Sequence, residues 1–395
     1  MALDRRGFFK SAGAGLTAAG LALTPRGTEA AVPEGMIQLS EKGKFERIAS
    51  CSYPIRSLFK SRPGGRGGQG GGLSEMKQKY GEITMLDFPQ FTKDTFPGVW
   101  KMDIFSSLFG DVTDDSMFTQ GRGFDPSSTS GRRWLEELAK KCQATGTQVQ
   151  HISNNAPTNL ASADAAQRKE GVEIAKRWLD GCAVLGPRSM RMNSVTALGP
   201  AVRPNAIPRS TDGYPRNLEI GPLLDAAIES YKEMADHGGK LGIKVTFENH
   251  WGLAADPMNI RIMIDAVNHP YCEASPDFCN WEHEYMLVSG LKALAPYSHS
   301  NVHAKYWDRW GDKNDVQRGV RIMLAGGFKG TFALEYEAGP LNGVEGSKYL
   351  YKEVLAALSA PIPVTAADQA RAEASASRER SGATGPRPST MLGAP

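Results

Sequence analysis

The chain has 395 residues, of which 41% are hydrophobic and 23% are charged, and its formal net charge is +3. This composition is ordinary for a globular protein and excludes a chain that is disordered throughout. The 46 basic and 43 acidic residues are spread along the sequence without a dense basic run, so nucleic acid is not an expected partner.

The first 31 residues resemble a twin-arginine export signal. Arg5 and Arg6 precede a small, apolar segment that runs to Leu23, and a small-residue site follows at Ala30 and Ala31. We therefore expect residues 1–31 to send the protein through the twin-arginine translocase to the periplasm or another extracytoplasmic space. No apolar run reaches the length of about 18 residues that a membrane span needs, so none is expected.

Three further features concern regions outside a folded core. The five cysteines stand singly, and an odd number does not favour a disulfide framework. The glycine tract at residues 63–72 is expected to form a loop. Residues 365–395 contain almost no large apolar side chain and are expected to be a disordered tail.

Between these limits, short apolar runs alternate with helical patterns, which is typical of strand–helix units in a parallel sheet. Eight runs are predicted as strands: 48–53, 99–105, 147–152, 189–193, 243–248, 272–277, 301–303 and 331–335. The glycine pairs that begin at Gly238 and Gly326 are each expected to end a helix. Eight units favour a single (β/α)8 TIM barrel over residues 44–360. A doubly wound sheet is the alternative, although no GxGxxG turn follows the first run.

Each of the last four predicted strands ends in a side chain that can bind a cation. These residues are Glu248, Asp277, His303 and Glu335, separated by 29, 26 and 32 residues, close to one strand–helix unit each. The C-terminal ends of barrel strands lie at one face, so the four side chains are expected to meet there. Three carboxylates and one imidazole suit Mn²⁺, Mg²⁺ or Co²⁺, with Zn²⁺ as a further choice.

The motifs FENHWG, SPDFCN, VHAKYWD and GGFKGTFALEYEAG resemble the four metal-site motifs of the xylose isomerase-like TIM-barrel superfamily, the sugar phosphate isomerases and epimerases. The resemblance extends over residues 44–360. It implies that Glu248, Asp277, His303 and Glu335 bind one divalent ion and that the two glutamates transfer protons. Glu337 is a competing candidate for the fourth ligand, because strand alternation puts it on the same face as Glu335.

The same resemblance suggests roles for neighbouring residues. Those expected to contact a sugar are His250, Asn280, Arg309, Trp251 and Trp307, and Phe278 is a third aromatic candidate for stacking on the ring. Lys305 and Asp308 complete an HxKxxD pattern and are expected to orient His303.

The chain also departs from the family pattern. It carries Asp103 where the second strand usually ends in a glutamate, and it lacks an acidic residue that ketose epimerases have beyond Trp251. The identity of the substrate therefore stays open.

The predicted chemistry is abstraction of a proton next to a carbonyl of a sugar or sugar derivative, with an enediolate stabilised by a Lewis-acidic ion. Return of the proton to another carbon gives isomerisation, and its return to the opposite face of the same carbon gives epimerisation. Expulsion of a leaving group would instead make the protein a 3-keto-glycoside lyase or hydrolase, which is the alternative. A barrel that binds metal and sugar without catalysis is a second alternative, and assembly into a homo-oligomer is left open. Phosphodiester hydrolysis on a three-metal site is disfavoured, because few of the seven histidines lie at strand ends.

Overall fold

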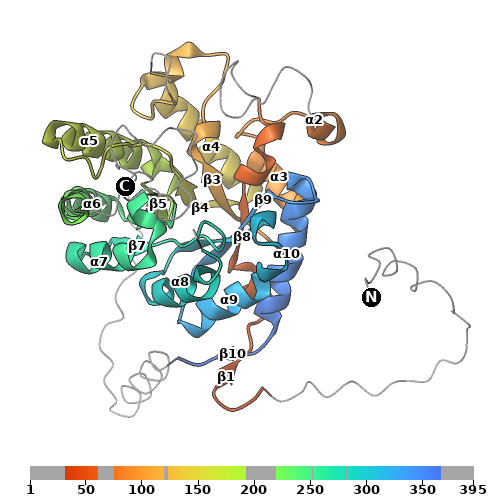
Figure 1. Ribbon diagram of the computed structural model, residues 1–395. Coiled ribbons are helices and arrows are strands. Elements are labelled where there is room, and N and C mark those ends of the chain that lie inside the picture. The colour runs from red at the N-terminus through yellow and green to blue at the C-terminus, as the bar shows by residue number, and fades with distance from the viewer. Residues whose placement is uncertain are drawn as a thin grey trace, which may run out of the picture.

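The protein folds as a barrel of eight parallel strands surrounded by helices (Figure 1). The computed structural model describes residues 32–60, 75–119, 123–192, 219–250, 252–281 and 283–365. The barrel strands are β2 (Ile48–Cys51), β3 (Lys101–Phe105), β4 (Gln148–Ser153), β5 (Ser189–Arg191), β6 (Lys244–Phe247), β7 (Cys272–Ala274), β8 (Asn301–Trp307) and β9 (Thr331–Ala338). Each strand overlaps one of the eight predicted apolar runs, and the predicted TIM-barrel fold is confirmed. The observed bounds differ from the predicted ones, since β7 ends before Asp277, whereas β8 and β9 continue past His303 and Glu335.

The barrel closes between β7 and β8. Hydrogen-bonded neighbours follow the order β7-β6-β5-β4-β3-β2-β9-β8, and all these pairs are parallel. An isolated parallel bridge between Asp277 and His303 joins the two edge strands. Its backbone bonds run from Phe278 N to His303 O and from His303 N to Pro276 O, both at 3.1 Å. A doubly wound sheet has two open edges, so this closure excludes the alternative fold.

Helices cover the outside of the barrel (Figure 1). The main ones are α3 (Phe88–Thr95), α4 (Thr129–Thr145), α5 (Ala165–Cys182), α6 (Gly221–Leu241), α7 (Pro257–Val267), α8 (Met286–Leu294), α9 (Val316–Ala325) and α10 (Gly343–Ser359). Shorter helices are α1 (Glu41–Phe45), α2 (Glu75–Tyr80) and the 3-10 turns η1 (Tyr53–Leu58), η2 (Ser106–Leu108), η3 (Asp115–Met117), η4 (Ala183–Leu185), η6 (Gly252–Ala255), η7 (Ala295–Tyr297) and η8 (Asp308–Lys313).

The helix ends follow ordinary capping chemistry, with one correction to the sequence analysis. Polar side chains cap helix N-termini, as where Ser128 accepts a hydrogen bond from Gly131 N at 3.0 Å. Gly327, with φ +87°, follows the end of α9 as predicted. However, α6 continues through Gly238 to Leu241 and stops at Gly242, with φ +74°. Gly238 is needed for close packing instead, because an added Cβ would lie 2.4 Å from Ile243 O.

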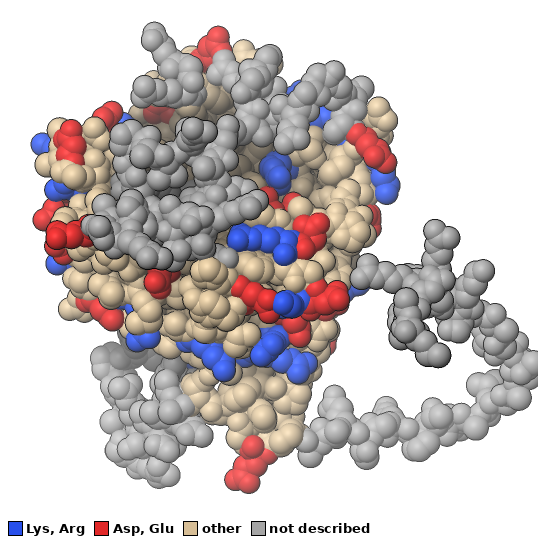
Figure 2. Space-filling model, in the orientation of Figure 1, with Lys and Arg blue, Asp and Glu red and all other residues tan. Residues whose placement is uncertain are grey.

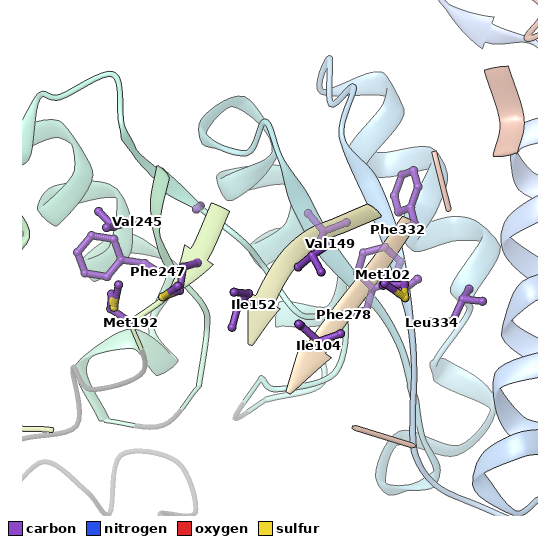
Figure 3. Packing of buried hydrophobic residues seen from close by; sticks show 14 of the residues in the cluster. Met102, Ile104, Val149, Ile152, Met192, Val245, Phe247, Phe278, Phe332 and Leu334 are labelled. Atoms are coloured by element: carbon purple, nitrogen blue, oxygen red, sulfur yellow. The ribbon is translucent and has the colours of Figure 1, made fainter. Parts of the chain in front are cut away.

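The two faces of the barrel strands carry different side chains. Apolar residues point toward the helices and form the core between the two layers, including Met102, Ile104, Val149, Ile152, Val245, Phe247, Phe332 and Leu334 (Figure 3). The barrel interior holds buried polar groups instead. Asn301 Nδ2 donates to Asp103 Oδ2 at 2.9 Å although β3 and β8 are not neighbours in the sheet, so this bond crosses the interior. These buried polar groups contact the predicted metal-binding residues, as where Asp103 contacts His303.

Few of the described residues lie outside the barrel and its helices. β1 (Met36–Ile37) and β10 (Ile362–Pro363) pair as an antiparallel ribbon at one end of the barrel (Figure 1). The predicted export signal, the glycine tract at residues 63–72 and the tail at residues 366–395 lie outside the described residues. All five cysteines are buried and free. Among the described helices, none has the length and apolar character to span a membrane.

The surface charge is mixed. In the view of Figure 2, acidic and basic side chains are interspersed over the described surface. This pattern agrees with the near balance of 46 basic and 43 acidic residues in the sequence.

Candidate metal centre

The four predicted cation-binding residues come together at the C-terminal ends of the barrel strands. Glu248 directly follows β6, and Asp277 follows β7 in the bridge that closes the barrel. His303 lies on β8 and Glu335 on β9. All four are buried, with residue exposures between 0% and 8%. The sheet therefore brings together side chains that are up to 87 residues apart in the sequence.

His303 Nδ1 is the centre of this cluster. It lies 3.5 Å from Glu248 Oε2, 3.8 Å from Asp277 Oδ2 and 3.4 Å from Glu335 Oε2. Neither His303 Nδ1 nor Asp277 Oδ2 makes a hydrogen bond in the described structure, although both atoms are buried. Two atoms that share one ion at about 2.1 Å lie about 3–4 Å apart, so these separations fit a metal site. Among the described residues, the ligand atoms of Glu248, Asp277 and His303 lie within 4.8 Å of one another, close enough to hold an ion, and those of Asp103, His151 and His303 do so as well.

The orientation of Asp277 is fixed by its own backbone surroundings. Its Oδ1 accepts hydrogen bonds from Cys279 N at 2.7 Å and Asn280 N at 3.0 Å. Asn249 holds the backbone on both sides, accepting from Asp277 N at 2.6 Å and donating to Asp277 O at 2.9 Å. This leaves Oδ2 as the oxygen directed into the cluster. Burial raises the pKa of Asp277 to about 7.

Asp103 holds the other side of the His303 ring. His303 Nε2 and Asp103 Oδ2 lie 2.8 Å apart, and Ser153 Oγ donates to Asp103 Oδ1 at 2.8 Å. Burial acts to raise the pKa of Asp103, but His151 and His303 lower it below its usual value. An ionised carboxylate only accepts hydrogen bonds, so His303 carries a proton at Nε2, and Nδ1 is the nitrogen that faces the candidate ligands.

The residues predicted to orient His303 have other contacts. Asp308 lies at the exposed start of η8, so Asp103 and not Asp308 is the carboxylate that contacts the ring. Lys305 contacts carboxylates, at 3.2 Å from Asp277 Oδ2 and 3.0 Å from Glu335 Oε1.

Glu335 and Glu337 are separated by depth in the barrel mouth. Glu335 Oε2 faces His303 Nδ1, whereas Glu337 accepts a hydrogen bond from Tyr53 OH at 3.1 Å and lies 3.1 Å from Lys305 Nζ. The side chain of Glu337 is also more exposed, at 21% against 10% for Glu335. This placement favours Glu335 over Glu337 as the fourth ligand.

Arg191 was missed by the sequence analysis. It ends β5, is buried, and forms an ion pair with Glu248 Oε2. It also donates to Asn155 Oδ1 at 2.9 Å, while Asn280 Nδ2 donates to Glu248 Oε1 at 3.0 Å. Burial opposes ionisation of Glu248, but Arg191 and His303 lower its pKa well below the usual range. The only sequence signal was an arginine inside a predicted apolar run.

The cluster carries more negative than positive charge. Five carboxylates lie in or beside it, on Asp103, Glu248, Asp277, Glu335 and Glu337. Three permanent cations face them, on Arg191, Lys305 and Arg56, the last at 3.9 Å from Glu337. Burial acts to lower the pKa of His303, but Glu335 and Glu248 raise it to about 10. If an ion displaced the protons of His303 and Asp277, five carboxylates would face three cations, and a divalent ion would balance the difference, so both the donor set and its charge fit a metal ion.

The residues predicted to contact a sugar are placed unevenly. Asn280 is buried in the cluster, and His250 follows Glu248 and Asn249 beside it. The Arg309 guanidinium stacks on Trp307, 5.3 Å from the ring centroid, and on Trp310 at 4.5 Å. Trp251 lies outside the described residues.

Phe278 does not reach the barrel mouth. It is buried in the core between strands and helices, with its ring centroid 6.3 Å from that of Phe332. Its ring also fills the space beside Gly319, where an added Cβ would lie 2.6 Å from it. The expectation that Phe278 stacks on a sugar is therefore wrong.

The fold agrees with a family comparison. The model of the xylose isomerase-like TIM barrel family matches residues 116–359, more than half of the chain, and the protein belongs to this family. Among curated protein sequences, none matches the chain significantly.

Several solved structures are similar to the chain at low sequence identity. A xylose isomerase-like TIM barrel protein from Mycobacterium smegmatis, in complex with magnesium, is 17% identical, with 80% of this chain and 99% of that chain covered and a TM-score of 0.51. The 3-keto-D-glucoside 4-epimerase from E. coli is 15% identical over 68% of this chain and 94% of its own, with a TM-score of 0.47. A D-psicose 3-epimerase from Clostridium cellulolyticum H10, solved with D-tagatose, is 15% identical over 70% and 92%, with a TM-score of 0.46.

Proposed function

We propose that the protein is a divalent-metal-dependent isomerase or epimerase that abstracts a proton next to a carbonyl of a sugar or sugar derivative. The observation that carries this proposal is His303 Nδ1, which is buried, makes no hydrogen bond with the described residues, and faces three carboxylates at 3.4–3.8 Å. Glu248, Asp277, His303 and Glu335 would hold the ion. Carboxylate oxygens predominate in this set, which favours Mg²⁺, Mn²⁺ or Co²⁺, and magnesium is the ion bound in the similar mycobacterial protein.

The ion, when bound, supplies a Lewis acid that polarises a carbonyl oxygen and makes the neighbouring C–H more acidic. Glu335 is better suited than Glu248 to accept the proton. Both oxygens of Glu248 already accept hydrogen bonds, from Asn280 and from Arg191. Glu335 Oε2 accepts none within the described residues, and Lys305 contacts only its other oxygen. An oxygen that accepts no hydrogen bond keeps a lone pair available for a proton.

Other residues of the mouth are suited to binding hydroxyl groups. Glu337 and Arg309 offer an acceptor and donors there, and Trp307 offers an apolar ring face. A polyhydroxylated substrate matches this mixture of polar groups with one aromatic surface.

The test measures exchange of the proton next to the carbonyl with solvent in metal-loaded protein. Purified protein is loaded with Mn²⁺ and incubated in D₂O with a panel of keto-sugars and 3-keto-glycosides, and NMR detects deuterium next to the carbonyl. We expect deuterium uptake by the wild type and its loss in Glu335→Gln, whereas Glu229→Gln on the exposed face of α6 should exchange normally. Release of an aglycone would instead identify a lyase, and sugar binding without exchange would identify a non-catalytic barrel.

We also propose that the protein is exported by the twin-arginine pathway, on the evidence of Arg5 and Arg6 before the apolar segment. Replacing both arginines with lysine should leave the precursor in the cytoplasm, as measured by fractionation and immunoblotting. Normal export of this variant would exclude the pathway.

A further inference from the structure

Lys305 lies where negative charge is densest in the candidate metal centre. Its Nζ is 3.2 Å from Asp277 Oδ2 and 3.0 Å from Glu335 Oε1, two of the candidate ligand residues. The same Nζ is 3.1 Å from Glu337 Oε2 and 3.0 Å from Asn280 Oδ1, which lie outside the ligand set. The side chain is only 4% exposed. One ammonium group therefore contacts both the ligand carboxylates and the carboxylate next to them.

The strand register explains this position. Lys305 follows His303 by two residues on β8, so both side chains face the barrel interior, with Lys305 about 7 Å nearer the mouth. On the neighbouring strand, Glu335 pairs in register with Lys305, and Glu337 is two residues further out. Lys305 thus lies between an inner carboxylate that faces His303 and an outer one that does not.

The charge of Lys305 has opposite consequences with and without an ion. Without one, the ammonium compensates buried carboxylates that would otherwise repel each other. With an ion, the same positive charge is close to a second cation and competes with it for Asp277 and Glu335. Glu337 offers an alternative partner at the same distance, further from His303.

We propose that Lys305 is a built-in counter-cation that opposes metal binding, and that its contacts pass from Asp277 and Glu335 to Glu337 and Asn280 when an ion is bound. This inference rests on the metal site of the proposed function and adds a residue that limits how tightly the site holds its ion. The ion then remains exchangeable although its ligands are buried.

The first test measures Mn²⁺ affinity, with Mn²⁺ alone as the probe. Full-length protein is stripped of metal, and free Mn²⁺ is followed by electron paramagnetic resonance during titration. Lys305→Met keeps most of the side-chain volume and removes the charge, so we expect at least about tenfold tighter binding. Lys305→Arg keeps the charge and should stay within about threefold of the wild type. Equal or weaker binding by Lys305→Met would overturn the proposal.

The second test examines the outer partner. Glu337→Gln should weaken Mn²⁺ binding in the wild-type background, because Lys305 then keeps its contacts with the ligands. The loss should be clearly smaller in the Lys305→Met background, where no ammonium is present. An equal loss in both backgrounds would show that Glu337 acts on the ion directly, and the transfer of contacts would be wrong.

Thermal unfolding tests the proposal if the metal-free Lys305→Met variant is unstable. If Lys305→Met unfolds early when stripped, Mn²⁺ should raise its melting temperature more than it raises that of the wild type. A smaller rise would count against the inference. If the wild type binds no divalent ion, the proposed function fails, but Lys305→Met still tests the role of Lys305. Mn²⁺ binding gained by this variant would support the counter-cation, and continued absence of binding would reject it.

Discussion

His303 and Asp103 are joined by a hydrogen bond of 2.8 Å between Nε2 and Oδ2, across 200 residues of sequence. Both side chains are fully buried, and Asn301 and Ser153 hold the carboxylate from two further directions. The bond determines which ring nitrogen faces Glu248, Asp277 and Glu335. Asp103 therefore positions the imidazole.

Replacing Asp103 with Asn should weaken Mn²⁺ binding by about 10- to 100-fold, because the ring of His303 loses its fixed tautomer and part of its basicity. Isothermal titration of metal-free protein measures this change. Asp265→Asn is the matched control, since Asp265 bonds to Tyr297 OH on the exposed side of α7. Unchanged affinity in Asp103→Asn would mean that the ring orientation does not depend on this carboxylate.

Metal binding should become tighter as the pH rises from 5 to 8. The pKa of Asp277 is raised to about 7 and that of His303 to about 10, so an ion must displace protons from both below pH 7 and from His303 alone between pH 7 and 10. We expect release of about two protons per ion at pH 6 and about one at pH 8. Calorimetry in buffers of different ionisation enthalpy counts these protons. The same proton count at both pH values would contradict the assignment of these two ligands.

The barrel could be predicted from the sequence because its strands are short apolar runs at regular spacing. The same regularity predicts Glu248, Asp277, His303 and Glu335 at strand ends. The structure brings the four together, with His303 and Glu335 inside their strands. The local sequence pattern was therefore sufficient to predict the barrel and the four cation-binding positions.

Contacts across the barrel interior could not be predicted in this way. Arg191 lies inside an apolar run, and only the pairing of β5 with β6 brings it to Glu248. Lys305 was expected to act on His303, but adjacent residues of one face differ in depth, and depth directs its ammonium to Asp277 and Glu335. The prediction of a helix stop at Gly238 is wrong because sequence does not show which glycines are required by tight packing.

Replacing Asp277 with Asn should separate stability from metal binding. The amide can keep the contacts of Oδ1 with Cys279 N and Asn280 N while it removes a charge from a crowded, buried cluster. We expect a melting temperature without metal that is at least equal to that of the wild type, and no rise when Mn²⁺ is added. The wild type should gain about 2.7 kcal/mol when free Mn²⁺ is 100 times its Kd. A normal Mn²⁺-induced rise in Asp277→Asn would exclude Asp277 as a ligand.

Two adjacent glycines of α6 should respond in opposite ways to alanine. At Gly238 the added Cβ would lie 2.4 Å from the backbone oxygen of Ile243, which cannot move without shifting the start of β6, so we expect a loss of about 1–3 kcal/mol. At Gly239 the nearest atom is 3.2 Å away, on the side chain of Tyr271, which can adjust. There alanine should be neutral or stabilise the helix by up to about 1 kcal/mol. Urea unfolding of the two variants measures the difference in the free energy of unfolding. Similar losses at both positions would show that close packing at Gly238 does not distinguish it from Gly239.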